Sequence, residues 1–135
     1  MATGSAGTVA RDYHTSQTHY LKKTLAFNTA SNGASVTMGV VPANSSIVRV
    51  YATVTTAFNA GTTNRIDIGN TTTAAAFGTF AVTSAGVKTD TGTLATAAMT
   101  LVKPSADQTI TTTYTQSATA ASAGSADVIV EYINL

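Results

Sequence analysis

Two histidines, His14 and His19, are the residues of this 135-residue chain whose type best suits metal or proton chemistry. They lie five positions apart in a polar N-terminal segment, and the chain contains no cysteine. A zinc site needs three or four ligands in a fixed geometry, which two histidines on an extended segment do not supply. We therefore expect no metal site and interpret the pair as solvated or packed in an interface. A metal shared at the symmetry axis of an oligomer is the alternative.

The carboxylates stand singly along the chain, which argues against acid–base catalysis. General acid–base and glycosidase chemistry need two carboxyl groups in one cleft. We expect Asp90 and Asp107 to lie in turns, and Asp67 and Glu131 to lie on the solvent-facing side of strands. The sequence has neither a Gly-x-Ser-x-Gly nucleophile motif nor a phosphate-binding glycine loop. It therefore predicts no catalytic residue, no cofactor and no enzymatic activity.

The charge balance also narrows the class of partner. Seven Lys and Arg residues against six Asp and Glu give a net charge of +1, and charged residues make up only 10% of the chain. Such a balance lacks the electrostatic signature of a nucleic-acid or membrane-surface protein. No apolar run approaches the roughly 18 residues of a membrane span. Because low net charge promotes association, we expect a protein that works within an assembly.

The elements that must position these residues are strands. The chain has 28 Thr and 24 Ala, and its Thr, Val, Ile and Tyr residues fall in short runs separated by Gly, Asn, Pro and Ser. No long segment has helical spacing of apolar residues. We expect eight strands, at 20–28, 35–41, 46–58, 64–69, 79–85, 97–103, 108–116 and 125–133. This spacing predicts an all-β fold, a jelly-roll-like β-sandwich of about eight antiparallel strands over 20–135.

Two strands show clear alternation of apolar and polar residues. In 46–58 the apolar face is expected to comprise Val48, Val50, Ala52 and Val54. In 125–133, Val128, Val130 and Tyr132 share a face. The segment 59–63 is expected to be the hairpin turn that joins the third and fourth strands. Phe27, Phe58 and Phe80 are expected to lie in the core.

Residues 1–19 lack an apolar face and are expected to form an extended N-terminal arm. Tyrosine offers a large contact area at low entropic cost, so Tyr13 and Tyr20 are candidates for anchoring the arm on a neighbouring chain. A place in the core is an equally good interpretation of Tyr20. With the neighbouring Arg11 and the two histidines, the expected partner interface comprises Arg11, Tyr13, His14, His19 and Tyr20.

Two segments resemble small virion proteins of tailed bacteriophages, of the kind that cement or decorate capsids or decorate tails. They are 42–69, which reads PANSSIVRVYATVTTAFNAGTTNRIDIG, and 126–133, which reads ADVIVEYI. The resemblance implies a jelly-roll-like body, often trimeric, attached to a shell. It transfers neither an active site nor a specific location within the virion. Together with the low charge and the expected arm, it leads us to expect a cement or decoration subunit on the capsid surface, with the major capsid protein as partner.

A receptor- or glycan-binding module of a phage tail or head fibre is the alternative function. Such sites usually combine exposed aromatic residues with Asp, Asn or Arg on loops. The expected loops 59–64, 70–78 and 117–124 consist mostly of Ala, Thr, Gly and Ser. We therefore rank this function below a capsid cement or decoration subunit.

Overall fold

The computed structural model describes residues 17–89 and 104–135. The expected arm up to residue 16 and the expected strand 97–103 lie outside these residues. The described residues form eight strands, which are β1 (Thr18–Ala26), β2 (Ser35–Val41), β3 (Ser45–Thr56), β4 (Asn64–Asn70), β5 (Gly78–Ala81), β6 (Gly86–Thr89), β7 (Gln108–Gln116) and β8 (Ser125–Asn134).

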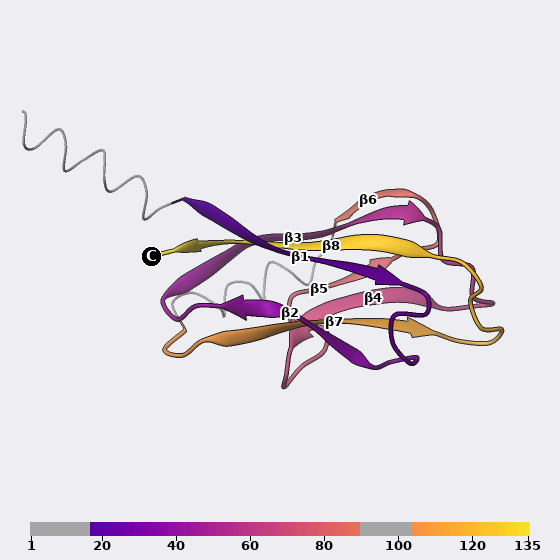
Figure 1. The fold of residues 1–135 in the computed structure, drawn as a ribbon, viewed down its shortest axis with the longest axis horizontal. Coiled ribbons are helices and arrows are strands. Elements are labelled where there is room, and N and C mark those ends of the chain that lie inside the picture. The colour runs from indigo at the N-terminus through magenta and orange to yellow at the C-terminus, as the bar shows by residue number, and fades with distance from the viewer. Residues whose placement is uncertain (1–16, 90–103) are drawn as a thin grey trace, which may run out of the picture.

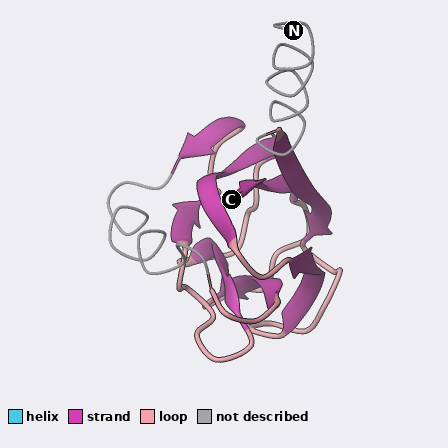
Figure 2. Ribbon diagram, turned by 90° about the vertical axis from the view of Figure 1, so that its left-hand side faces the viewer, coloured by secondary structure: helices cyan, strands magenta, loops and turns pink. Residues whose placement is uncertain are grey.

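The strands form two antiparallel sheets that pack face to face. Sheet A has the strand order β1-β8-β3-β6 and sheet B the order β2-β7-β4-β5. The two sheets are the upper and lower layers of Figure 1, and Figure 2 shows their strands joined by loops, with no helix in the described part of the chain. The first strand pairs with the last and the second with the seventh, which is the arrangement of a jelly roll. The expected β-sandwich of eight antiparallel strands is confirmed.

The core lies between the sheets and is built from the inward-facing residues of both. Along β8, Ala126, Val128 and Val130 are fully buried and alternate with half-buried residues. Of the predicted face, Val128 and Val130 lie in the core, and the half-buried Tyr132 packs against it. Phe58 and Phe80 are buried in the core, and the half-buried Phe27 packs against it. The largest fully buried side chains are Phe77, Phe80, Leu25, Ile66, Ile68 and Ile110.

The predicted alternation in β3 is correct only for its second half. Val50, Ala52 and Val54 are buried as expected, but Val48 is 52% exposed and Ile47 is buried in its place. The pairing of β3 with β8 shifts by one residue between Ile47 and Arg49. A β-bulge inserts an extra residue and reverses the facing of the residues before it.

The segment 59–63 is not a hairpin turn. β3 belongs to sheet A and β4 to sheet B, so the chain crosses from one sheet to the other here. Gly61 N donates to Thr119 O at 2.9 Å, which ties the crossing loop to the loop 117–124. The backbone of this loop bonds partly to the side chain of Asn64 and partly to a segment far along the chain, and not in a hairpin ladder.

Most strand positions agree with the sequence, and β6 is the exception. Strands β2 and β7 have the predicted bounds. β6 has only four residues, of which three are exposed, so it lacks the buried alternation on which the strand predictions were based. It adds to β3 at the edge of sheet A.

Candidate partner-binding surface

The chemistry-bearing residues of the described chain do not gather into a metal or catalytic centre. Within residues 17–89 and 104–135, no three His, Asp or Glu side chains lie close enough together to hold a metal ion. No helix among these residues has the length and apolarity needed to cross a membrane. The polar and aromatic side chains gather instead on the outer face of sheet A.

Three cross-strand rows of side chains make up this outer face. The pairing of β8 with β1 and β3 defines the rows as Tyr20–Glu131–Arg49, Lys22–Ile129–Tyr51 and Thr24–Asp127–Thr53. Directly opposed side chains on one face of a sheet are close enough to interact. We call these nine residues the sheet A surface.

One ion pair lies within the first row, and a second joins the second and third rows. Arg49 Nη2 donates to Glu131 Oε1 at 3.0 Å, and the guanidinium carbon of Arg49 lies 4.5 Å from the centre of the Tyr51 ring. The hydrogen bond to Glu131 and the charge of that carboxylate raise the pKa of Arg49. Asp127 accepts a hydrogen bond from Thr24 Oγ1 at 2.6 Å, and Lys22 Nζ lies 3.5 Å from its other oxygen. Ion pairs and hydrogen bonds therefore link the three strands across this solvent-facing surface.

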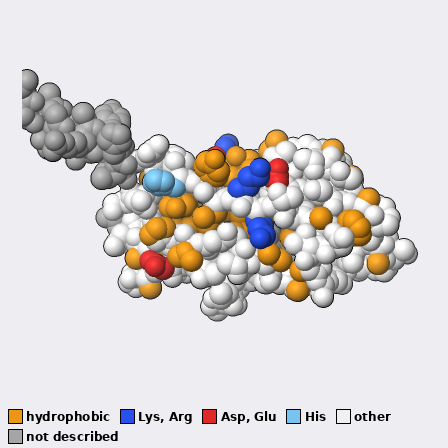
Figure 3. All heavy atoms as spheres, in the orientation of Figure 1, with side chains coloured by type: hydrophobic (Ala, Val, Ile, Leu, Met, Phe, Trp, Pro, Cys, Tyr) orange, Lys and Arg blue, Asp and Glu red, His pale blue; other side chains and the backbone are white. Residues whose placement is uncertain are grey.

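The cations and one aromatic ring project further into solvent than the carboxylates. The side chains of Lys22 and Arg49 are 52% and 56% exposed, against 27% and 23% for Asp127 and Glu131. Tyr20 is 68% exposed. Tyr20, Tyr51 and Ile129 help to line a shallow pocket of about 260 Å³. Figure 3 shows the Lys and Arg side chains in this view gathered among hydrophobic side chains near the middle of the molecule.

The tyrosines and the arginine of this surface are residue types common in protein-binding surfaces, so we treat it as a candidate. Interfaces are enriched in Tyr and Arg, with an apolar centre and a polar rim. Here the half-buried Ile129 lies between Lys22 and Tyr51, and the row beside it carries Tyr20 and the ion pair of Glu131 with Arg49. The exposed Val87 of β6 lies next to Thr53 and continues the apolar area toward the other edge of the sheet.

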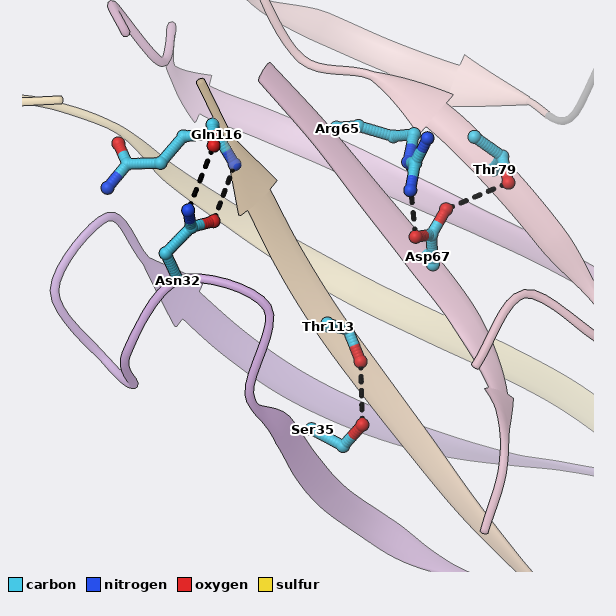
Figure 4. A network of polar contacts seen from close by, with 7 residues as sticks. All are labelled: Asn32, Ser35, Arg65, Asp67, Thr79, Thr113 and Gln116. Carbon is cyan, nitrogen blue, oxygen red and sulfur yellow. Dashed lines mark hydrogen bonds and ion pairs between the residues drawn. The ribbon is translucent and has the colours of Figure 1, made fainter. Parts of the chain in front are cut away.

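The outer face of sheet B is different, because it is rich in hydroxyl groups. Ser35 and Thr113 share a hydrogen bond of 2.9 Å, and Asp67 accepts one from Thr79 Oγ1 at 2.8 Å and one from Arg65 Nε at 3.1 Å (Figure 4). Asp67 is only 3% exposed, so the prediction that it faces solvent was wrong. Its two described partners satisfy the carboxylate, as burial of a charge requires. We interpret Asp67 as a structural residue.

The loops at one end of the sandwich are held rigidly together. Asn59 Nδ2 donates to Ser122 Oγ at 3.0 Å, and Asn59 Oδ1 accepts from the backbone N–H groups of Ser122 and Ala123. Asn32 exchanges two hydrogen bonds with the backbone of Gln116, as Figure 4 shows. The loop 117–124 is therefore tied by hydrogen bonds to the loop that crosses between the sheets.

Two of the five expected interface residues fall within the described part of the chain. Tyr20 lies on the sheet A surface, which rules out a core position for it. His19 points to the opposite side of β1 and stacks on Tyr132 with 5.5 Å between ring centres. β1 begins at Thr18, so both belong to a strand of the body. Arg11, Tyr13 and His14 lie outside the described residues.

The sequence prediction missed the other members of the surface. Lys22, Tyr51 and Ile129 belong to three strands that are far apart in the chain. Alternation alone puts Tyr20 and Lys22 on one side of their strand, and Ile129 and Glu131 on one side of theirs. The sequence did not show that β1 pairs with β8, and only this pairing places the two sets of side chains on one surface.

Comparison with known proteins bears on the fold. No protein-family model matches the chain, and no curated protein matches it in sequence. A chain in the acidic stable capsid structure of Helicobacter pylori bacteriophage KHP30 is similar, with a TM-score of 0.60 and 13% identity over 87% of this chain and 88% of that one. A chain of the cyanophage Pam1 capsid asymmetric unit has a TM-score of 0.61 and 18% identity, over 89% of this chain and 86% of that one.

The capsid of Ralstonia phage GP4 also contains a similar chain. Its TM-score is 0.56 and its identity 16%, over 89% of this chain and 84% of that one. In all three comparisons the likeness covers nearly the whole of both chains, so it concerns the complete sandwich. The chain therefore has the fold of proteins found in the capsids of these three phages.

Proposed function

We propose that this protein is a structural virion component that binds the outside of a phage capsid and stabilises it, as a cement or decoration subunit. The observation that carries the proposal is the shared fold over nearly the full length of chains from three phage capsids. The two sequence segments that resemble virion proteins support it independently. Its partner on the shell is the major capsid protein.

The sheet A surface is our candidate for the contact with the shell. It combines an exposed tyrosine with an arginine that is positioned by its own ion pair. A side chain that is already ordered loses less conformational entropy when it binds. We further propose that the protein is a homotrimer, in which three such contacts act together and increase avidity. Light scattering would then give a molar mass of three times the 13.7 kDa of one chain.

Binding to undecorated capsids tests the role of the surface. Tyr20→Ala removes the exposed ring, and we expect it to raise the Kd for capsids at least about 30-fold, because an interface tyrosine can contribute 2 kcal/mol or more. Val40→Ala is the matched control, since Val40 is also exposed but lies on β2 in sheet B. If both variants bind as the wild type does, the sheet A surface is not the contact.

The alternative is a receptor- or glycan-binding module. One observation favours it: the shallow pocket brings Tyr20 and Tyr51 together with Asp127 and Glu131. Carbohydrate sites combine aromatic rings with carboxylates in this way. Incubation of the labelled protein with undecorated capsids and, separately, with host cells distinguishes the two functions. Binding to cells alone would overturn the cement proposal.

A further inference from the structure

The edge of sheet A formed by β1 has unpaired backbone groups. Both backbone groups of Ala26 bond to Thr29: Ala26 N donates to Thr29 Oγ1 at 2.8 Å, and Thr29 N donates to Ala26 O at 3.1 Å. The pair Ala26–Ser125 is therefore not hydrogen-bonded across the strands. In an antiparallel ladder, bonded and unbonded pairs alternate.

This alternation fixes the direction of the other backbone groups. The register of β1 with β8 runs without a break from Thr18 to Ala26. The N–H and C=O groups of Thr18, Tyr20, Lys22 and Thr24 therefore point away from β8, and no backbone partner for them lies among the described residues. The same residues direct their side chains to the outer face of sheet A.

The other three sheet edges are less suited to accept a strand. β5 and β6 have four residues each, and the register of β2 shifts between Thr37 and Gly39. Short strands, bulges and lysine side chains are the usual protection of a sheet edge against pairing with another chain. β1 has nine residues, no proline and an unbroken register, so its two lysines are its only protection of this kind.

The charge of β1 indicates what kind of strand would fit. Its sequence THYLKKTLA contains two lysines and no carboxylate. Lys22 pairs with Asp127 on the outer face, whereas no described carboxylate lies within ion-pairing distance of Lys23 on the other face. A second copy of β1 would bring lysines against lysines, which is unfavourable in directly opposed positions. A strand with acidic side chains would be complementary.

We propose that an extended, acidic segment of the shell protein pairs with β1 and adds a fifth strand to sheet A. The inference rests on the proposed function, because it names the means by which the subunit holds the shell. Main-chain hydrogen bonds to Thr18, Tyr20, Lys22 and Thr24 would provide affinity. Side chains of the added strand would lie beside Tyr20 and Lys22 at the rim of the shallow pocket, which would provide specificity.

Hydrogen exchange with capsids present and absent tests the pairing directly. In the free protein, the amides of Leu21 and Lys23 point toward β8 and should exchange slowly, while those of Tyr20, Lys22 and Thr24 exchange fast. On capsids we expect the second set to slow at least tenfold. Unchanged exchange of these amides on bound protein would overturn the proposal.

A proline at an outward-facing position tests the same edge by mutation. Thr24→Pro removes an N–H that points away from β8, a position where an edge strand tolerates proline. Thr24→Val is the matched control, since it also loses the hydrogen bond to Asp127 but keeps the N–H. We expect Thr24→Pro to raise the Kd for capsids about tenfold above that of Thr24→Val, with both variants folded by circular dichroism. Equal affinity of the two folded variants would refute the pairing.

Charge reversal tests the acidic nature of the added strand. We expect Lys23→Glu to weaken capsid binding at least fivefold, and Lys88→Glu, on the opposite edge of sheet A, to leave it unchanged. Equal weakening would exclude an acidic segment at β1. If the wild-type protein itself does not bind capsids, the proposed function fails and the pairing with it. If the wild type binds and the β1 variants bind equally well, only the pairing fails.

Discussion

At the scale of single residues, Asn64 shows how a polar side chain can hold an irregular loop. It is 7% exposed, and its Oδ1 accepts hydrogen bonds from Ala60 N at 2.9 Å and from the hydroxyl of Tyr114 at 2.8 Å. Its Nδ2 donates to Ala60 O at 3.0 Å. Side-chain bonds thus replace the backbone ladder where the chain crosses between the sheets. The Tyr114 ring also packs on Phe58, with 4.6 Å between the ring centres.

Burial of Tyr114 predicts a pH dependence of stability, because burial raises the pKa of its hydroxyl above the ordinary value of 10.0. The folded state then keeps a proton that the unfolded state loses above this pH, so the free energy of unfolding falls as the pH rises. We expect Tyr114→Phe to be about 1 kcal/mol less stable than the wild type at neutral pH, for loss of one hydrogen bond. This difference should shrink above pH 10. Urea unfolding of both proteins at several pH values measures it, and a difference independent of pH would contradict the prediction.

At the scale of elements, the bulge in β3 decides which residues belong to the core. Both Ile47 and Val48 are apolar and β-branched, so neither composition nor propensity distinguishes them. The shift of register against β8 leaves Ile47 4% exposed and Val48 52% exposed. The bulge also determines which residues before Arg49 face outward, on the same side as the sheet A surface.

Substitution of Ile47 and of Val48 by alanine tests whether the bulge in β3 is present. We expect Ile47→Ala to lower the free energy of unfolding by about 2–4 kcal/mol, because it leaves a cavity in the core. Val48→Ala should change it by less than about 0.5 kcal/mol, as is usual for an exposed site. Denaturant unfolding of the two variants gives both values. The reverse order would mean that the strand alternates without a bulge.

At the scale of the whole molecule, the low charge and the exposed tyrosine and cations of the sheet A surface suit the proposed role as a subunit bound to a particle. A ligand that binds the assembled shell and not its free subunits stabilises the shell by mass action. The increase is about 2.7 kcal/mol per site at a hundredfold excess over the Kd. Cementing in this sense needs no chemistry and no change in the shape of the shell.

The melting of capsids should therefore depend on the concentration of this protein. We expect the disassembly temperature of undecorated capsids to rise when the protein is added, and to keep rising with the logarithm of its concentration above the Kd. Scanning calorimetry at increasing protein concentration measures the shift, with the weakened Tyr20→Ala variant as the control. A disassembly temperature that does not change at full occupancy would mean that the protein decorates the shell without stabilising it.

Much of the strand layout could be predicted because it depends on local signals. β2 and β7 were predicted with their observed bounds, since alternation and flanking turn residues mark both ends. β6 was missed because four mostly exposed residues carry no such pattern. The burial of Asp67 was missed for a different reason: its partner Thr79 lies on another strand, and only the pairing of β4 with β5 brings the two together.

The sequence by itself determined that this protein is a lightly charged, all-β domain, because composition and the alternation of residues within each strand are local signals. It also made Tyr20 a candidate for partner contact, because this tyrosine follows the polar N-terminal segment. The tertiary structure decided which strands share a sheet, and therefore which side chains share a surface. β1 and β8 stand about a hundred residues apart in the chain, yet the row Tyr20–Glu131–Arg49 exists only because they pair. Which strands pair, and in which register, depends on burying the apolar face of every strand in the complete sandwich. The pairing of strands therefore cannot be predicted from any single segment of the chain.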